Sequence, residues 1–193
     1  MRIARTFLMI VLVSLCLAST VDDWNDTVTH QGTGYTVSVP RSWRYLQPPG
    51  RGPEHLFEAS GHALPASHNG DPVIVTAFIG TFPASSLADA KKNTIQGYSE
   101  NPDRVFPSGT KYQEKDFKLS GGQPATLLST RFFRKSKNLQ QSRFDLVAYM
   151  PSHKRALLYT LSVQYVDDTY RLEQELKLAE LALKMFGAVK LEP

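Results

Sequence analysis

The alternation of apolar and polar residues between positions 111 and 165 constrains the fold of this chain more than any other feature. Four runs carry strand-forming residues: 111–119, 124–133, 144–150 and 157–165. The first two flank Ser120-Gly121-Gly122-Gln123, and paired glycines supply the positive φ angles that a tight hairpin needs. The last two alternate with a period of two, which is the pleat of a strand. We therefore predict four consecutive strands, arranged as two hairpins in series with a polar interval between them.

Two further runs predict strands before these hairpins. Residues 34–40 place Tyr35, Val37 and Val39 on one face and end at a proline, which has no donor for the ladder. Residues 73–79 are apolar on both faces, which is typical of a central strand that is covered on both sides. Between these runs lies a long loop, 48–70, rich in Pro, Gly and His, inside which 56–59 could form a short strand.

Two segments predict helices. The first begins at Ser86, whose spacing to Asp89 resembles a capping box, and ends near Asn101-Pro102. The second begins after a cap at Asp167 or Asp168, and residues at helical spacing predict its core face: Leu172, Leu176, Ala179, Leu183 and Phe186. Three apolar residues lie outside both this face and the polar stripe: Leu178, Leu181 and Met185. We expect them to be covered by residues 20–33, by the long loop or by a partner.

Together these elements predict the α+β class, with an antiparallel sheet and helices on both faces, as in an α/β/α sandwich. We expect a single domain over residues 34–189. Residues 19–33 are polar around one tryptophan and predict an extended arm or linker.

The N-terminus predicts export. Residues 1–18 form a secretory signal peptide by pattern, with a basic start, an apolar run and small residues before Ser19. The apolar run is shorter than the roughly 20 residues that cross a bilayer, so we expect no transmembrane segment after cleavage. Acylation of Cys16, as in a lipoprotein, is the alternative, although the bulky Leu15 before it disfavours that cleavage. Since Cys16 is the only cysteine, we predict a secreted or periplasmic protein without disulfides.

Charge and motifs exclude several classes of function. Removing Arg2 and Arg5 lowers the formal charge from +4 to +2, which gives no argument for nucleic-acid binding. The sequence has no Gly-x-Ser-x-Gly elbow, no His-Glu-x-x-His pair and no phosphate-binding Gly-rich loop. We therefore expect a non-catalytic protein without a cofactor.

One candidate metal site lies in the long loop. His55, His62 and His68, together with Glu54 and Asp71, are plausible ligands for zinc or copper. Their spacings match neither helical nor hairpin geometry, and histidines in loops are usually solvated. For these reasons we keep the binding of a metal or small ligand by the 48–70 loop as the alternative function and not as the main one.

A second candidate site is the basic interval between the two predicted hairpins, which contains four cations: Arg134, Lys135, Lys137 and Arg143. On a protruding loop these side chains could bind an acidic protein surface or an anionic lipid headgroup. The competing interpretation is a solvated loop whose charges keep a sheet edge from pairing with other chains. Together with the 48–70 loop and the apolar flank formed by Leu178, Leu181 and Met185, this interval forms the surface that we expect to bind a protein partner.

The start of the first predicted strand also suggests a family. Gly34-Tyr35-Thr36-Val37-Ser38-Val39-Pro40 followed by Ser42-Trp43 resembles the opening G-Y-x-φ-x-φ-P-x-x-W (φ apolar) of the PsbP-like fold. The order that follows, a strand, a helix, two hairpins and a closing helix ending in Lys184-Met185-Phe186, is similar to that group. Met185 departs from the serine usual at its position. The resemblance implies a non-catalytic protein that binds or stabilises an assembly, because the group includes photosystem II proteins, a Ran-binding import factor and secreted bacterial proteins of the DcrB type.

Overall fold

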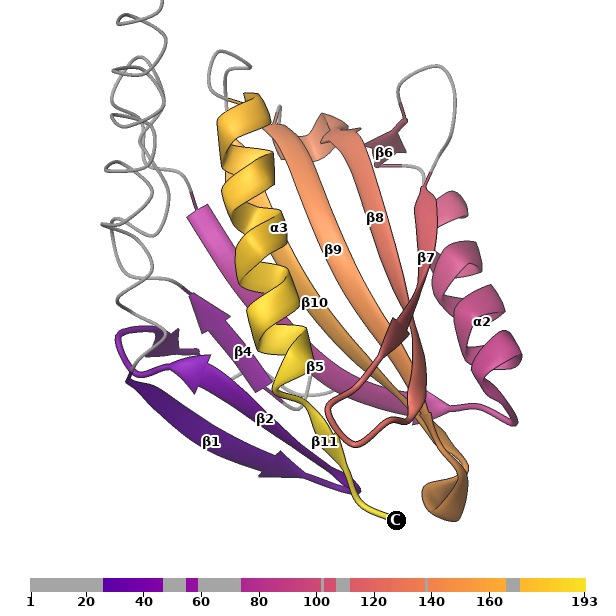
Figure 1. Cartoon of the computed structure of the whole chain (residues 1–193). Helices are drawn as coiled ribbons and strands as arrows, with labels where there is room; N and C mark the ends of the chain where they lie inside the picture. The colour runs from indigo at the N-terminus through magenta and orange to yellow at the C-terminus, as the bar shows by residue number, and fades with distance from the viewer. Residues whose placement is uncertain are drawn as a thin grey trace, which may run out of the picture.

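The structure is a computed structural model, and it describes residues 26–46, 55–58, 74–101, 103–106, 112–137, 139–165 and 171–193. The predicted signal peptide, His62, His68 and most of the 48–70 loop lie outside these residues. The large sheet contains β3 (Arg44–Tyr45), β4 (His55–Glu58), β5 (Ile74–Pro83), β6 (Arg104–Val105), β7 (Gln113–Lys118), β8 (Pro124–Arg134), β9 (Leu139–Met150) and β10 (Arg155–Tyr165). The small sheet contains β1 (Thr27–Gly32), β2 (Tyr35–Pro40) and β11 (Lys190–Leu191). The helices are α2 (Leu87–Ser99) and α3 (Arg171–Gly187), with 3-10 turns η2 (Lys135–Lys137) and η3 (Pro151–His153) (Figure 1).

The large sheet has eight strands in the order β3-β4-β5-β10-β9-β8-β6, with β7 also paired to β8. Every pairing among the described strands is antiparallel. The four predicted strands are confirmed as consecutive neighbours, β7 to β10. The predicted polar interval is wrong in extent, because β9 begins at Leu139, opposite Arg134, and η2 alone connects it to β8. Arg143 therefore lies inside a strand, opposite Ser162, and not on a protruding loop.

The N-terminal sheet differs from prediction in one respect. β2 is confirmed, with Tyr35, Val37 and Val39 buried on one face. Residues 27–32, predicted as part of an arm, form β1 and pair with β2 along their full length. The polar sequence concealed this strand because β1 lies at the edge of a sheet and none of its residues is fully buried. Strands β1 and β11 extend the folded region on both sides of the predicted limits, 34 and 189.

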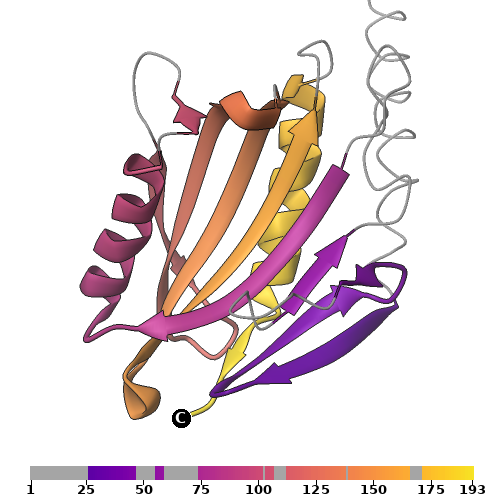
Figure 2. The ribbon, with the colours of Figure 1, turned by 180° about the vertical axis from the view of Figure 1, so that it is seen from behind.

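The sheet separates two cores because successive residues of a strand point to opposite faces. Leu146 and Ala148 of β9 join the core formed by α3 and the small sheet. Val147 joins a second core that contains Ala90 of α2. Figure 2 shows α3 behind the sheet and α2 at its left, beside β8. The α+β class is confirmed. The predicted helices on both faces, as in an α/β/α sandwich, are not shown: α3 shares its side with the small sheet, and α2 packs mainly on β8 and β9.

Helix α3 is rotated about its axis relative to prediction. Leu176 and Leu183 of the predicted core face are 60% and 47% exposed, whereas Phe186 of that face is buried as predicted. Among the described side chains of α3, the other fully buried apolar ones are Leu178, Ala182 and Met185. The helix carries two apolar stripes, so periodicity alone could not decide which one faces the sheet. Phe186 contacts Tyr159 of β10 edge to face, with ring centroids 5.1 Å apart.

The start of α2 follows the capping prediction. Ser86 is the N-cap, and its hydroxyl accepts a hydrogen bond from the backbone N–H of Asp89 at 3.1 Å. The Asp89 carboxylate accepts from Ser85, and the backbone N–H of Ser85 is the main reason that the pKa of Asp89 is lowered. None of the described helices is long and apolar enough to cross a bilayer.

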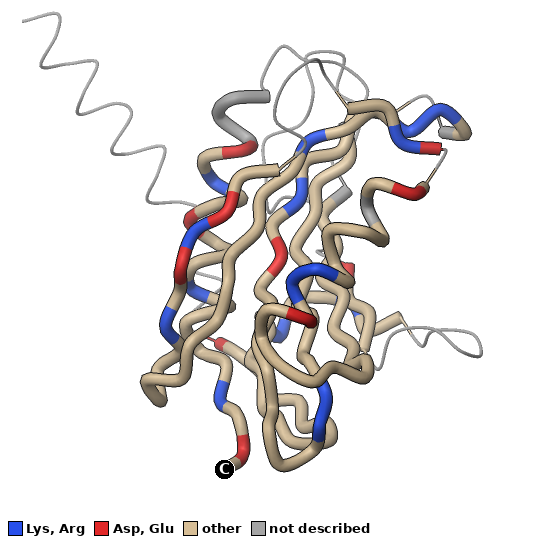
Figure 3. Tube along the Cα trace, turned by 90° about the vertical axis from the view of Figure 1, so that its right-hand side faces the viewer, with Lys and Arg blue, Asp and Glu red and all other residues tan. Residues whose placement is uncertain are grey.

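Charged residues of both signs follow one another along the outer strand β7, whose sequence is Gln-Glu-Lys-Asp-Phe-Lys (Figure 3). Lys91 of α2 forms an ion pair with Glu114 of this strand. Such charges hinder pairing of a sheet edge with another chain. The outer edge at β7 is therefore an unfavourable place for a partner to add a strand.

Candidate functional site

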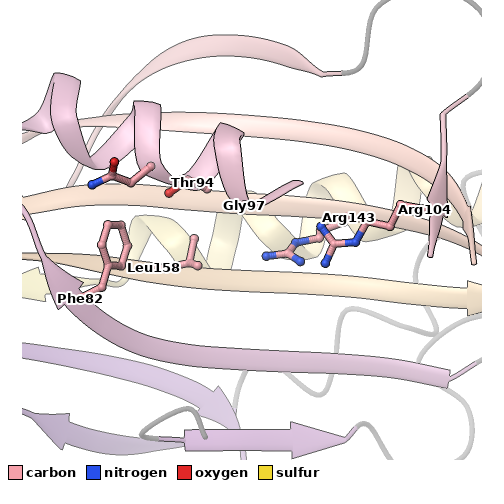
Figure 4. Close-up of a pocket in the computed structure, with 7 residues that line it drawn as sticks. Phe82, Thr94, Gly97, Arg104, Arg143 and Leu158 are labelled. Carbon is pink, nitrogen blue, oxygen red and sulfur yellow. The ribbon is translucent and has the colours of Figure 1, made fainter. Parts of the chain in front are cut away.

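A pocket of about 240 Å³ lies between the last turns of α2 and the sheet. Its seven lining residues come from five elements: Phe82 (β5), Asn93, Thr94 and Gly97 (α2), Arg104 (β6), Arg143 (β9) and Leu158 (β10). Figure 4 shows Arg104 and Arg143 at one end, with Phe82 and Leu158 toward the other. Gly97 borders open space at the pocket, since a Cβ added there would have no atom within 4 Å. We call this site the α2 pocket.

Arg143 is held in the α2 pocket by a buried hydrogen-bond network. Its Nε lies 2.9 and 3.0 Å from the two carboxylate oxygens of Asp145, and its Nη2 lies 2.8 Å from Oδ1. Nη2 also donates to the Thr160 hydroxyl at 3.0 Å, and that hydroxyl donates to Asp145. Arg143 and Asp145 share a face because they are two residues apart on β9, and Thr160 lies directly opposite Asp145. The Asp145 carboxylate is thus fully engaged behind Arg143.

Arg104 is held by an aromatic surface. Its guanidinium carbon lies 4.8 Å from the ring centroid of Phe132, within the range of a cation–π interaction. Phe106 packs on the same ring, with centroids 5.9 Å apart. Both arginines of the α2 pocket are therefore positioned by groups outside it, and their side chains extend toward each other in Figure 4.

The predicted basic interval does not act as one loop. Arg134 forms an ion pair with Asp103, with Nε 3.3 Å from Oδ2. The same carboxylate accepts from the backbone N–H and the hydroxyl of Ser136, and the backbone bond is the main reason that the pKa of Asp103 is lowered. Lys135 remains exposed on η2, and the Lys137 side chain lies outside the described part of the structure. Of the three predicted cations whose side chains the structure describes, only Arg143 lines the α2 pocket.

The predicted apolar flank of α3 is likewise corrected. Leu178 and Met185 are completely buried in the chain's own core, and Leu181 is partly buried against it. Because the sheet faces this stripe of the helix, Leu178 and Met185 are unavailable to a partner. Among the leucines of α3 whose side chains are described, Leu176 and Leu183 are exposed.

The one described residue of the predicted metal site, His55, lies in an aromatic cluster between the two sheets. Its ring centroid is 5.7 Å from that of His30, and Tyr45 and Phe57 pack beside both histidines. Neither ring nitrogen of His55 has a hydrogen-bond partner among the described residues. Within these residues no three His, Cys, Asp or Glu side chains gather closely enough to hold a metal ion. Burial is the main reason that the pKa of His30 is lowered, and the electrostatic effect of the neighbouring His55 is the second.

The chemistry available in the α2 pocket is that of binding. The seven described lining residues supply two guanidinium groups, one amide, one hydroxyl and apolar walls, but no carboxylate, thiol or imidazole. The hydroxyl of Thr94 already donates to the carbonyl oxygen of Ala90 at 2.9 Å. General acid–base or nucleophilic catalysis needs a proton acceptor in reach of the reacting group, and this set offers none. Sequence reasoning singled out Arg143 alone; the Arg143-x-Asp145 spacing on one strand face was the available signal.

Comparisons with known proteins bear on the fold. Neither protein-family models nor curated protein sequences match the chain. Among solved structures, LpqN of Mycobacterium tuberculosis, described as involved in cell envelope biogenesis, is 18% identical with a TM-score of 0.50, over 86% of this chain and 90% of LpqN. The Ran-binding protein Mog1p of Saccharomyces cerevisiae is 11% identical with a TM-score of 0.53, over 86% of this chain and 95% of Mog1p. The chain therefore has the Mog1/PsbP-like fold, consistent with the resemblance in its sequence.

Proposed function

We propose that this chain is an exported, non-catalytic binding protein that docks on a protein partner through the α2 pocket. The observation that carries the proposal is the lining of that pocket, which combines two positioned guanidinium groups with apolar walls and lacks an acid–base pair. Such a lining favours recognition of an anionic group over reaction with it.

The shared fold supports a binding role. Mog1p is described as Ran-binding, and LpqN is described by its part in cell envelope biogenesis. Neither description names a reaction. One fold serves many functions, so the site carries the argument and the fold adds to it.

Export is proposed from residues 1–18, and the cell-envelope role of LpqN agrees with it. Mass spectrometry of the protein from its source would test this. Cleavage after Ala18 predicts a mature chain that starts at Ser19, whereas a lipoprotein would retain an acylated Cys16. Recovery of the intact chain from Met1 would refute export by cleavage.

Site-directed photo-crosslinking in the source cells tests the docking surface. A photo-reactive amino acid at Asn93, exposed at the pocket, should give a discrete protein adduct, and the adduct should weaken when Arg104→Gln is added. The control places the same amino acid at Glu180, exposed on α3 across the sheet. Equal adducts from both positions, or an adduct insensitive to Arg104, would contradict docking at the α2 pocket.

The alternative function is metal or small-ligand binding by the 48–70 loop. It is favoured by the two ring nitrogens of His55, which have no hydrogen-bond partner within the described part of the chain. Zinc titration by calorimetry tests it, comparing the protein with a triple variant, His55→Ala, His62→Ala and His68→Ala. A His153→Ala variant is the matched control, since His153 also has a buried ring nitrogen. Zinc binding that is lost in the triple variant alone would support the metal site, and no binding would remove it.

A further inference from the structure

The α2 pocket is polarised along its length. Both of its charged lining residues, Arg104 and Arg143, are cations, and they lie at one end. Phe82 and Leu158 line the part toward the other end, on neighbouring strands β5 and β10. A ligand that fills this pocket therefore carries an anion and an apolar group close together.

The positioning of the arginines favours a carboxylate as the anion. A guanidinium is a planar fork of N–H donors that matches the two oxygens of a carboxylate. The Nε and Nη2 edge of Arg143 already holds the Asp145 carboxylate, so Arg143 contributes a fixed guanidinium group and not the fork itself. The fork for a ligand carboxylate is that of Arg104, which the Phe132 ring supports. Positioning before binding lowers the entropy that a ligand must overcome.

The size and the rim of the α2 pocket restrict the ligand further. About 240 Å³ lies below the roughly 300–1,000 Å³ typical of pockets for drug-sized ligands, so one residue-sized group fits. At the rim, the Asn93 side-chain N–H donates toward Asp89 Oδ1 at 3.4 Å, which leaves the Asn93 carbonyl oxygen as an acceptor. A carboxylate, an apolar group and an N–H donor are thus all accommodated.

The C-terminal residue of a protein carries these three groups on one Cα atom. An internal Asp or Glu presents its carboxylate at the tip of a side chain, with no apolar branch beside it, and would leave the Phe82 and Leu158 end unfilled. We propose that the α2 pocket binds the C-terminal carboxylate of the partner together with an apolar last side chain. This inference rests on the proposed function and names the group through which the partner docks.

Titration of the purified full-length protein with small mimics, followed by NMR at the backbone amides of Thr94 and Gly97, tests the proposal. N-acetyl-leucine carries all three groups and should shift these signals saturably. N-acetyl-leucinamide lacks the charge and should bind at least about tenfold more weakly, the usual effect of losing a charged hydrogen bond. N-acetyl-glutamate α-amide represents an internal acidic side chain, and inorganic phosphate represents a bare anion; both should also bind more weakly.

Two variants connect the binding to this pocket. Arg104→Gln should weaken the binding of N-acetyl-leucine at least about tenfold. Arg134→Gln should leave this binding unchanged, because Arg134 pairs with Asp103 outside the pocket. Gly97→Leu should fill the open space at the pocket and abolish binding without lowering Tm, because leucine is a better helix former than glycine and the space is empty. Gly97→Ala is its size control.

Each outcome decides the proposal. The proposal would be overturned if N-acetyl-leucinamide, N-acetyl-glutamate α-amide or inorganic phosphate bound as tightly as N-acetyl-leucine. It would also be overturned if the Gly97→Leu variant bound N-acetyl-leucine as tightly as the unchanged protein. A loss of Tm in Arg104→Gln with unchanged binding would also overturn it, since Arg104 would then serve the fold alone. If the Asn93 crosslink forms and the leucine mimic does not bind, this inference fails and the proposed function stands; if the mimic binds and no crosslink forms, docking on a protein fails instead.

Discussion

Replacing Arg143 by leucine should destabilise the protein severely, because it leaves the Asp145 carboxylate buried without its cation. The side chain of Asp145 has no exposed surface and that of Arg143 is 13% exposed, so solvent cannot replace the lost partner. Breaking such a buried pair costs about 3–5 kcal/mol in the free energy of unfolding. For a chain of this size each kcal/mol lowers Tm by about 2–4 °C, so the expected loss is about 6–20 °C.

The assay is urea denaturation followed by circular dichroism, with two reference variants. Arg41→Gln breaks an ion pair whose partners are 64% and 68% exposed, and should cost less than about 1 kcal/mol. The double variant Arg143→Leu, Asp145→Leu removes both charges and should recover most of the loss. If Arg143→Leu costs no more than Arg41→Gln, or if the double variant is no better than the single one, the buried network is not as described.

Three further predictions concern stability. Gly34→Ala should lower the free energy of unfolding more than Gly122→Ala. Both glycines have φ near +80°, where alanine costs about 1–2 kcal/mol, but only at Gly34 would the new Cβ lie 2.7 Å from the imidazole of His153 in η3. Equal losses of stability would refute that contact. Leu178→Ala should lower the free energy of unfolding by about 2–5 kcal/mol and Leu183→Ala by less than about 1 kcal/mol, because only Leu178 is buried. The reverse order in urea denaturation would mean that the helix face predicted from the sequence is the one that packs on the sheet. Because the pKa of His30 is lowered in the folded state, the unfolded chain binds more protons at mildly acidic pH. The contribution of neutral His30 to stability is therefore present above the ordinary histidine pKa and is lost as the pH falls below it. Tm should fall less steeply with decreasing pH in His30→Phe than in the unchanged protein, and identical slopes would contradict this.

The large sheet was predictable where its contacts are local. Strands β7 to β10 follow one another in sequence and in space, so alternation and turn residues together predicted their order. The start of β9 was missed because Gln141 and Ser142 are buried polar residues, and a pattern of hydrophobicity does not register them. Ser142 is buried beside Glu175 of α3, to which its hydroxyl donates at 2.6 Å.

Contacts between distant segments were not predictable. Residues 73–79 were predicted as a strand and β5 spans Ile74–Pro83, but nothing in the run indicates that it pairs with β10, far along the chain. The choice between two apolar stripes on α3 likewise depends on the sheet that the helix meets. The α2 pocket depends on such long-range contacts, since its seven residues come from five elements and only Arg143 carried a local signal.

A crystal structure of the protein bound to the partner trapped from Asn93 would test the central claim most directly. We predict that the partner's last residue lies in the α2 pocket, with its carboxylate against Arg104 and Arg143 and its side chain against Phe82 and Leu158. A complex in which the partner lies on α3 or on the small sheet, with the α2 pocket facing solvent, would contradict the account.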